Sequence, residues 1–468
     1  MPVYRRYGGA FFSIDLPHDR AAPERTHLAG RSRAAPERTY ILNPFDKRCA
    51  AWDMARDITS PSSADQLATI LIPEEKNSSS LYFSDAARAL MSGAIVSLMR
   101  TAPGAWEFRD VIYALKNAER LKKLLSQTLE TKDLIPQYFS NERTANDVIS
   151  TVATKIQRYQ YIAAAWSRAQ QKISLTKWVT ENSILVLGND EATRSALDAI
   201  NRVIFKRITE LVLAQSESHT RRTWFFLDEL RQAGKLDGLN SLLTMGRSKG
   251  ACVAIGFQDI EGLASVYGDR EAAEIAGLCA NKAILRLDSP HTAKWAASVL
   301  GEREILEVRA SSGTTSGENK GLGSTRTTSS GESSSVSEQV SKRELILGSE
   351  FMDIPPTNFE YGLLGTYLIP EVGAYRVKVG GEWLKNALHP PSKTIANLVR
   401  RGAEDEVLFP WNDDDFRRLG LPKEKEIYRP NGKFELEESE PIETEGTAPS
   451  EGDENYEKMM RLFKSEKP

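Results

Sequence analysis

The sequence predicts an α/β fold with a mainly parallel sheet that is interrupted by an all-α segment. Two short apolar runs indicate the sheet: Trp224–Leu227, which reads WFFL, and Cys252–Gly256, which reads CVAIG. Unbroken apolar runs of this length are typical of strands covered on both faces, as in a parallel α/β sheet. The all-α segment is indicated by roughly 120 residues of helical periodicity between Trp52 and a further apolar run, Ile184–Leu187.

The helical segment is predicted from apolar stripes at helical spacing. One stripe follows Ser84, which we expect to be an N-cap, and further helices are expected at 108–125 and 148–159. A plain helical layer packed on the sheet would give the same periodicity. The first stripe consists of Ala87, Leu90, Met91, Ala94, Ile95 and Leu98.

Beyond Ile184–Leu187, helical and strand patterns alternate along the chain. We expect helices at 189–214, 272–278 and 289–300, and strands at 283–287, 361–368 and 374–379. Residues 310–338 are rich in Ser, Thr and Gly and too polar to pack, so they predict a mobile loop. A surface insertion explains this loop better than an element that grips DNA.

Two carboxylates end the first apolar run. Asp228 and Glu229 directly follow Leu227, at the carboxyl end of a strand, where open α/β sheets hold ligands. This is the Walker B pattern, in which Asp228 would hold Mg²⁺ and Glu229 would polarise an attacking water. Acidic residues that only cap a following helix are the alternative at this point.

The next strand adds two candidates. A helix with leucines from Leu236 is expected to end near Gly246, and the strand after it carries Gln258 to the same sheet edge. The Gln258 amide could sense a γ-phosphate or place a water. Arg247, between helix and strand, is a candidate finger that reaches the nucleotide of a neighbouring subunit.

Four stretches together resemble the type IV secretion coupling proteins of the TraD/TraG family. They are FFLDEL, GRSKG, IGFQD and, at 41–54, ILNPFDKRCAAWDM. The resemblance extends from about Ile41 to about Val379 and includes GERE at 301–304. The helical segment matches the all-α domain that is inserted in these proteins.

The resemblance implies a RecA-like P-loop NTPase core and a hexameric DNA pump of bacterial conjugation. It implies that Asp228 and Glu229 are the Walker B pair, that Arg247 is the arginine finger, and that Gln258 couples nucleotide state to DNA. The implied cofactors are ATP and Mg²⁺. The implied partners are single-stranded DNA, relaxosome proteins and channel components at the inner membrane, where the family is anchored.

The sequence contains no G-x-x-x-x-G-K-[ST] loop, so the lysine and glycines that cradle phosphates are missing. Gly234-Lys235 and Gly432-Lys433 lack the following Ser or Thr, and Gly321–Thr325 has no lysine. In the family this loop lies before the ILNPFD motif, and whether its absence here reflects a truncated gene model stays open. Here RAAPERTH at 20–27 and RAAPERTY at 33–40 form a local duplication instead. We expect nucleotide binding to be impaired.

These observations divide the chain into four parts. Residues 1–55 are expected to be a truncated first part of the RecA-like domain, in which the assignment of 1–40 stays open. Residues 56–178 are the inserted all-α domain, and 179–388 are the nucleotide-binding domain. Residues 389–468 are expected to be a largely disordered acidic tail.

Composition agrees with a cytoplasmic protein that reaches the inner membrane through partners. The formal charge is −3, but ten acidic residues and no Lys or Arg lie between Glu435 and Glu457, so the rest is basic. A basic body suits a nucleic-acid partner, although a solvated surface explains it almost as well. The longest apolar stretch, 89–99, is too short to span a membrane. Neither the three cysteines, expected to be free thiols, nor the five histidines form a metal set.

Two classes of function remain open. One is a DNA-translocating ATPase subunit that needs missing residues from another polypeptide. The other is a non-catalytic remnant or binding module that recognises the relaxosome or DNA. A HerA-like or FtsK-like translocase is a weaker third choice, because it does not explain NPFD together with the helical insertion.

Overall fold

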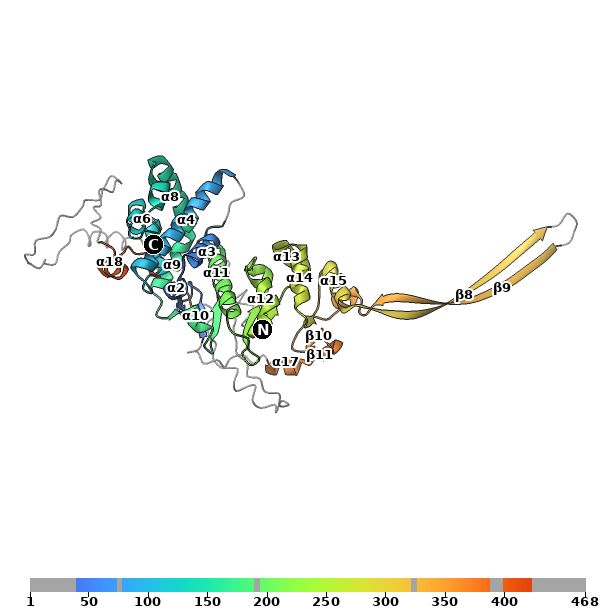
Figure 1. Ribbon diagram of the computed structural model, residues 1–468. Helices are drawn as coiled ribbons and strands as arrows, with labels where there is room; N and C mark the ends of the chain where they lie inside the picture. The colour runs from blue at the N-terminus through green and yellow to red at the C-terminus, as the bar shows by residue number, and fades with distance from the viewer. Residues whose placement is uncertain (1–38, 74–77, 189–193, 321–325, 388–398, 423–468) are drawn as a thin grey trace, which may run out of the picture. The chain divides into compact units, whose positions relative to one another are not determined.

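The computed structural model describes residues 39–73, 78–188, 194–320, 326–387 and 399–422. The described residues up to Gly420 form one compact unit. Figure 1 shows its elements in chain order. No helix of the described residues is long and apolar enough to cross a membrane.

Three strand pairs are parallel, as the sequence predicted. β1 (Thr39–Leu42) pairs with β4 (Ile184–Leu187), β2 (Ala51–Trp52) with β3 (Lys172–Ile173), and β5 (Thr223–Leu227) with β6 (Ala251–Ile255). Among the described residues these pairs lie in separate sheets rather than in one. The parallel pairing is therefore as predicted, whereas the pairs do not join into the one sheet that we expected.

The last strands depart from the parallel arrangement. β7 (Lys282–Ile284) and β11 (Gly373–Val379) both pair antiparallel with β10 (Leu363–Ile369). The tight turn between β10 and β11 requires this, because parallel strands need a long crossover connection. The face of this sheet that carries Ile284 packs on a core with α15 (Pro290–Leu300) and α16 (Gly348–Met352).

Burial of β5 differs from the prediction. Phe225 and Leu227 are buried, and Phe225 lies edge-on against Phe205 of α11 (Arg194–Leu213) with ring centroids 6.2 Å apart. Trp224 and Phe226, on the other face, stack on each other and are only half-buried. The strand is thus fully covered on one face, whereas the apolar run predicted cover on both.

The segment between β2 and β3 is helical, as predicted. The apolar stripe of α4 is fully buried, which confirms the core position of those residues. Ser84 is not an N-cap, because α4 begins six residues earlier and Ser84 lies buried inside it. Residues 108–125 form two helices, because Asn117 caps the second by accepting a hydrogen bond from the Arg120 N–H. The helices are α2 (Met54–Asp57), α3 (Pro61–Leu71), α4 (Ser78–Thr101), α5 (Phe108–Leu115), α6 (Ala118–Leu125), α7 (Leu134–Phe139), α8 (Glu142–Ile156), the 3-10 helix η2 (Gln157–Tyr159), α9 (Gln160–Ser167) and α10 (Leu175–Trp178).

A buried carboxylate holds the two ends of this helical segment together. Asp57 accepts hydrogen bonds from the Trp52 indole at 2.7 Å and from the Leu175 N–H at 2.6 Å. Its backbone oxygen accepts a further hydrogen bond from Arg207 of α11. The entry and exit of the helical segment are therefore fixed to each other and to the next helix.

The remaining helices follow the predicted order with shifted ends. The helix expected from Leu236 begins at Leu239, because residues 228–238 form a 3-10 turn and a loop. Residues 189–193 lie outside the described residues. The elements are η4 (Leu230–Ala233), α12 (Leu239–Met245), η5 (Gly246–Lys249), α13 (Ile260–Tyr267), α14 (Asp269–Leu278) and α17 (Gly381–Ala387).

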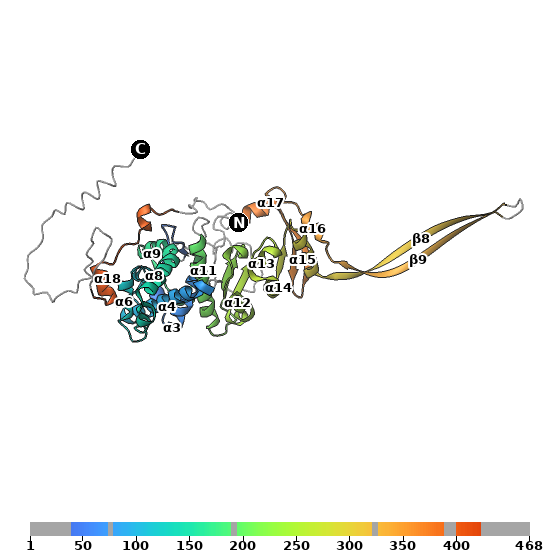
Figure 2. The same ribbon diagram turned by 90° about the horizontal axis from the view of Figure 1, so that it is seen from above.

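The prediction of a loop at 310–338 is wrong, because the described residues of this stretch form strands. β8 (Glu302–Lys320) and β9 (Arg326–Glu344) form a two-stranded antiparallel ribbon (Figure 2). Cross-strand hydrogen bonds satisfy the backbone without a core, which the polar composition alone did not reveal. One face carries exposed Leu306, Val308, Val336 and Val340 near the base of the ribbon.

Part of the predicted disordered tail is folded. Residues 399–420, which we call the clasp, include η6 (Ala403–Glu406) and α18 (Asp413–Leu419) and pack on the all-α segment. Arg109 of α5 donates to the Pro410 carbonyl and Arg168 to the Val407 carbonyl. The clasp departs from the prediction because ion pairs with α5 hold it in place, Arg109 with Asp415 and Arg418 with Asp110. Residues 423–468, which hold the acidic run, lie outside the described residues.

Candidate functional site

The carboxyl ends of β5 and β6 meet at the predicted Walker B pair. Gly256 donates its N–H to the Leu227 carbonyl and accepts from the Leu230 N–H, both at 2.9 Å. Asp228 and Glu229 lie between these two bonds, so they are held at the edge where β6 ends. Asp228 is exposed and Glu229 half-buried.

Glycine at 256 allows this close approach. A Cβ there would lie 3.0 Å from the Asp228 Oδ1 atom. Any larger residue would therefore press on the carboxylate, and the glycine leaves Asp228 room beside the end of β6.

Glu229 has an unusual backbone conformation. Its φ of 54° and ψ of 62° place it in the left-handed region, which costs a non-glycine residue about 1–2 kcal/mol. Strain of this kind persists where surrounding structure holds it. Here the strained turn points the chain from β5 into η4 and leaves Glu229 beside Gln258.

The electrostatics of Glu229 show which groups surround it. Burial, the charge of Asp228 and the charge of Asp259 raise the pKa of Glu229, while a hydrogen bond from the Gln258 amide lowers it. Three of the four predicted residues, Asp228, Glu229 and Gln258, are thus brought together. A carboxylate with a raised pKa beside an amide suits the positioning of a water and the acceptance of its proton.

Asp259 was missed as a neighbour of this site. It caps α13 by accepting a hydrogen bond from the Gly262 N–H, and its charge acts on Glu229. Its place directly after Gln258 is the signal that sequence reasoning passed over. Asp259 therefore links the end of β6 to the helix that follows.

The loop after Glu229 is fastened at two points. The Tyr267 hydroxyl accepts from the Leu236 N–H at 3.1 Å and lies 3.2 Å from the Gly234 carbonyl oxygen, to which it donates. Arg194 of α11 donates to the Gln232 carbonyl at 2.8 Å. Helices on two sides thus hold the segment that carries the strained Glu229.

Arg247 lies at the opposite end of β6 from the other three. It belongs to η5, before the strand, whereas Gln258 follows the strand, and five extended residues span about 16 Å. Its side chain is exposed and has no hydrogen bond or ion pair with another described side chain. Within one chain Arg247 therefore does not join Glu229.

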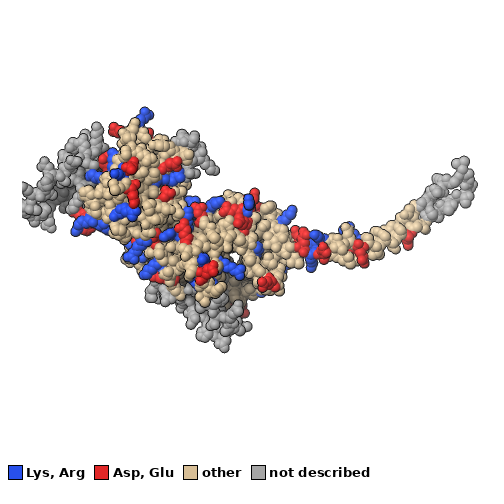
Figure 3. Space-filling view, viewed as in Figure 1, with Lys and Arg blue, Asp and Glu red and all other residues tan. Residues whose placement is uncertain are grey.

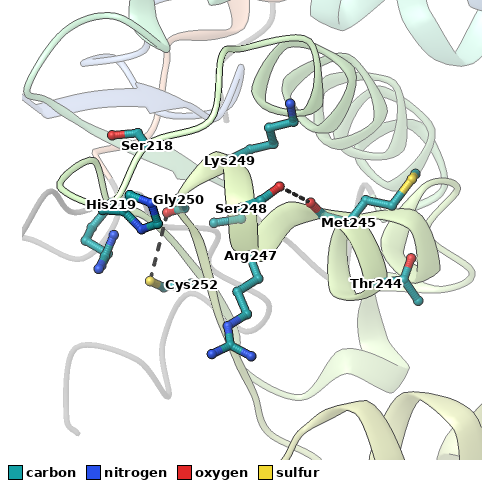
Figure 4. A pocket seen from close by; sticks show the side chains of 11 residues that line it. Ser218, His219, Thr244, Met245, Arg247, Ser248, Lys249, Gly250 and Cys252 are labelled. Carbon is teal, nitrogen blue, oxygen red and sulfur yellow. Dashed lines mark hydrogen bonds between the residues drawn. The ribbon is translucent and has the colours of Figure 1, made fainter.

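Arg247 lines a pocket at that end of the strands (Figure 4). Two loops enclose it and are hydrogen-bonded to each other, since Ser218 N–H donates to the Ser248 carbonyl at 3.0 Å and Thr223 N–H to the Gly250 carbonyl at 2.8 Å. Gly250 has a φ of 86°, and a Cβ there would lie 2.4 Å from the Arg221 carbonyl oxygen. Only glycine permits the two loops to approach in this way.

The site residues fit a magnesium ion better than they fit a triphosphate. An exposed carboxylate such as Asp228 suits Mg²⁺, which keeps several of its waters, and the described residues contain no cluster of three or more metal-ligating side chains. The ammonium group of Lys235, which follows a glycine, pairs with Glu271 at 2.7 Å. Gly321–Thr325 lies outside the described residues.

The three cysteines are free, as predicted. Cys49 is buried, and burial raises the pKa of its thiol to about 12. Cys252 and Cys279 are half-buried, and burial raises the pKa of both. None of them is a reactive thiolate at neutral pH.

Comparison with known proteins gives a consistent result. The family model described as the type IV secretion-system coupling protein DNA-binding domain matches residues 31–361. The coupling protein TraD of Escherichia coli strain K12 is 26% identical over 276 residues, which cover 57% of this chain and 38% of TraD. The chain thus spans well under half the length of that relative.

Solved structures show the same fold. The bacterial conjugative coupling protein TrwBdeltaN70 in its unbound form has a TM-score of 0.55, with 19% identity and 73% of each chain covered. TrwB in complex with ADP and Mg²⁺ has a TM-score of 0.54, with 18% identity and again 73% of each chain covered. The shared fold is an α/β fold with an all-α insertion.

Proposed function

The chain belongs to the family of type IV secretion-system coupling protein DNA-binding domains, and from this premise we propose that it is a subunit of a DNA-translocating ATPase of conjugation. In this proposal its strand pairs belong to a RecA-like core, and it links the relaxosome to the transfer channel. The observation that carries the proposal is the meeting of Asp228, Glu229 and Gln258 at the ends of β5 and β6.

Each of these residues has a proposed task. Asp228, exposed at the strand end, is the Mg²⁺ ligand, and ATP with Mg²⁺ supplies the phosphoryl chemistry when it is bound. Glu229 orients a water, which its raised pKa and fixed backbone support. Gln258 contacts Glu229 and is followed by the cap of α13, so a change at Gln258 can reach that helix.

The chain alone supplies only part of an ATP site. Backbone N–H groups of a glycine-rich loop and its lysine bind the phosphates in P-loop enzymes, and this sequence has no such loop. We therefore propose that activity requires the missing residues from another polypeptide. A mixed assembly with complete coupling subunits would provide them, whereas a homo-hexamer, the other assembly that we consider for this chain, would lack the loop in every subunit.

Arg247 has its proposed role in such an assembly. It lies far along β6 from Glu229 and is exposed, which suits a finger that reaches the nucleotide of a neighbouring subunit. An arginine that acted on its own subunit would need to lie beside Asp228. Arg247 thus depends on a neighbour for its function.

The proposed partners are single-stranded DNA, relaxosome proteins and channel components, which would bring the chain to the inner membrane. Figure 3 shows basic and acidic side chains interspersed on the visible face rather than gathered in one basic stripe. Binding to DNA by phosphate contacts alone is then weak, salt-dependent and independent of sequence.

A second candidate function is a non-catalytic module that binds the relaxosome or DNA. The absence of the phosphate loop from the sequence favours it. The two candidates differ in whether incorporation of the chain changes ATP hydrolysis by complete subunits.

ATP hydrolysis by the isolated chain and by a mixture tests the proposal. We expect a negligible rate for the chain alone, and a changed rate when it co-purifies with a complete related coupling protein. Glu229→Gln in the chain is expected to change the rate of the mixture further. An appreciable rate for the chain alone that disappears in Glu229→Gln would contradict the missing-loop argument. A mixture in which the subunits associate without any change in rate would favour the binding module.

A further inference from the structure

We propose that the ribbon of β8 and β9 is a contact surface between copies of this chain, in which one face of the ribbon packs on the opposite face of the next copy's ribbon. The observation that carries the proposal is an uncompensated pattern of charge at the start of the ribbon. The contact adds a surface to the assembly proposed above, and it involves neither nucleotide nor the residues at the carboxyl ends of β5 and β6.

Two successive cross-strand pairs of the ribbon carry like charges. Glu302 lies opposite Glu344, and Arg303 lies opposite Arg343. Directly opposed residues of an antiparallel pair have Cβ atoms about 4.5–5.5 Å apart, and like charges at that distance destabilise the pairing. None of these four side chains forms an ion pair or a hydrogen bond with another residue in the part of the chain that the structure describes. The ribbon of a single copy therefore leaves both repulsions uncompensated.

The two like-charged pairs lie on opposite faces of the ribbon, because successive side chains of a strand alternate between its faces. We call the face with Glu302 and Glu344 the glutamate face, and the face with Arg303 and Arg343 the arginine face. Figure 3 shows acidic and basic side chains close together where the ribbon begins. By the same alternation the arginine face also carries Ile305 and Arg309, and the glutamate face carries the exposed Leu306, Val308, Val336 and Val340.

Packing of the glutamate face of one copy on the arginine face of the next removes both repulsions. The paired glutamates then meet the paired arginines, and hydrogen bonds between carboxylate and guanidinium groups are among the strong ones. The exposed apolar side chains of the glutamate face lose contact with water against Ile305 and the aliphatic part of Arg309. A two-stranded ribbon is only marginally stable by itself, so a second layer also stabilises the pairing of β8 with β9.

The same charges identify the partner as a second copy of this chain. Contact between two glutamate faces, or between two arginine faces, brings like charges together and is unfavourable. A different partner with one charged surface would compensate only one face of the ribbon, whereas copies stacked in one direction compensate both. The contact is thus head to tail, with each copy presenting a different face to each of its neighbours. Contacts of this type close into a ring where the rotation between copies allows it.

Exchange of charges in the full chain, followed by sedimentation velocity without nucleotide, tests the proposal. The double variant Arg303→Glu with Arg343→Glu makes both faces acidic, and Glu302→Arg with Glu344→Arg makes both basic. Each keeps like charges across the ribbon, so the repulsion within one copy stays the same. We expect each double variant alone to weaken self-association about tenfold or more. An equimolar mixture of the two should associate again, because the acidic faces of one variant meet the basic faces of the other.

A matched control separates the ribbon contact from a general effect of charge. Lys132→Glu with Arg143→Glu reverses two exposed cations of the all-α segment, as Arg303→Glu with Arg343→Glu does on the ribbon, and we expect it to leave self-association unchanged. Circular dichroism shows whether the variants are folded, and the absence of nucleotide makes the test independent of the proposed ATPase. A wild-type chain that stays monomeric at every concentration, a control that weakens association equally, or a mixture that does not associate would overturn the proposal. Weakening by only one of the two ribbon variants would indicate contact between like faces and would overturn it as well.

Discussion

The clasp depends on one carboxylate, Asp415, and its removal gives the sharpest structural prediction. Asp415 accepts hydrogen bonds from Arg109 at 2.8 Å and 3.1 Å and from Arg418 at 2.9 Å, and its side chain is only 9% exposed. Arg418 also pairs with the fully buried Asp110, which accepts from the Trp411 indole. Two arginines and two carboxylates thus join α18 to α5.

The contribution of Asp415 follows from its pKa. Burial opposes its ionisation, but hydrogen bonds from Arg109 and Arg418 outweigh burial and lower the pKa from 3.8 to about 2. A shift of this size corresponds to about 2 kcal/mol of clasp stability. Because the pKa is lower in the folded state, this stability is present above pH 4 and is lost as the pH falls toward 2.

Asp415→Asn is the perturbation that tests this reasoning. It keeps the shape of the side chain but removes the charge, so two arginines lose a partner. We expect the free energy of opening of the clasp to fall by about 2–4 kcal/mol. Hydrogen exchange of amides in 399–420, read by mass spectrometry at neutral pH, would then speed up by about 30-fold or more.

Asp414→Asn is the matched control, since Asp414 is 80% exposed and, among the described residues, its one ion pair is with Arg417, three positions later. Exposed pairs contribute little, so its exchange rates should change by less than about threefold. The reasoning is refuted if Asp415→Asn leaves exchange of 399–420 unchanged, or if Asp414→Asn accelerates it as much.

Three further predictions concern the site and the pocket. Glu229→Gly should be more stable than Glu229→Ala by about 1 kcal/mol, and should unfold at a higher temperature, because glycine relieves the left-handed strain. Equal unfolding temperatures would show that the turn is unstrained. Gly250→Ala should lower the free energy of unfolding by about 2 kcal/mol or more, because the new Cβ would meet the Arg221 carbonyl and alanine disfavours this φ. The control, Gly277→Ala in α14, has open space around it and should raise the free energy of unfolding by about 0.5–1 kcal/mol in the same thermal scan. DNA binding by the full chain should be weak, equal for unrelated sequences and reduced by added salt in a fluorescence titration; tight, salt-insensitive binding to one sequence would contradict a purely electrostatic contact.

The sequence was informative where local pattern and topology agree. Short apolar runs located β5 and β6, and the rule that parallel strands end at one edge was enough to bring Asp228, Glu229 and Gln258 together. The apolar stripe of α4 located the centre of the helical core because it keeps the helical period over a long run of residues.

Other features depend on contacts that no local pattern records. The clasp is held by pairs such as Arg109 with Asp415, which are about 300 positions apart in the chain. The ribbon of β8 and β9 forms from cross-strand pairing, which a polar composition does not exclude. The strain at Glu229 arises from the turn between two elements and has no signature in residue type.

The claim that this chain works as a coupling subunit is tested most directly by complementation. A complete related coupling protein whose own finger arginine is replaced should hydrolyse ATP slowly, and addition of this chain should restore the rate where Arg247 faces a complete nucleotide site. A finger contributes about 10³-fold or more in rate. The account predicts restoration by the wild-type chain and by Arg143→Ala, and none by Arg247→Ala, although co-purification shows that all three assemble. Restoration by Arg247→Ala, or none by the assembled wild-type chain, would contradict it.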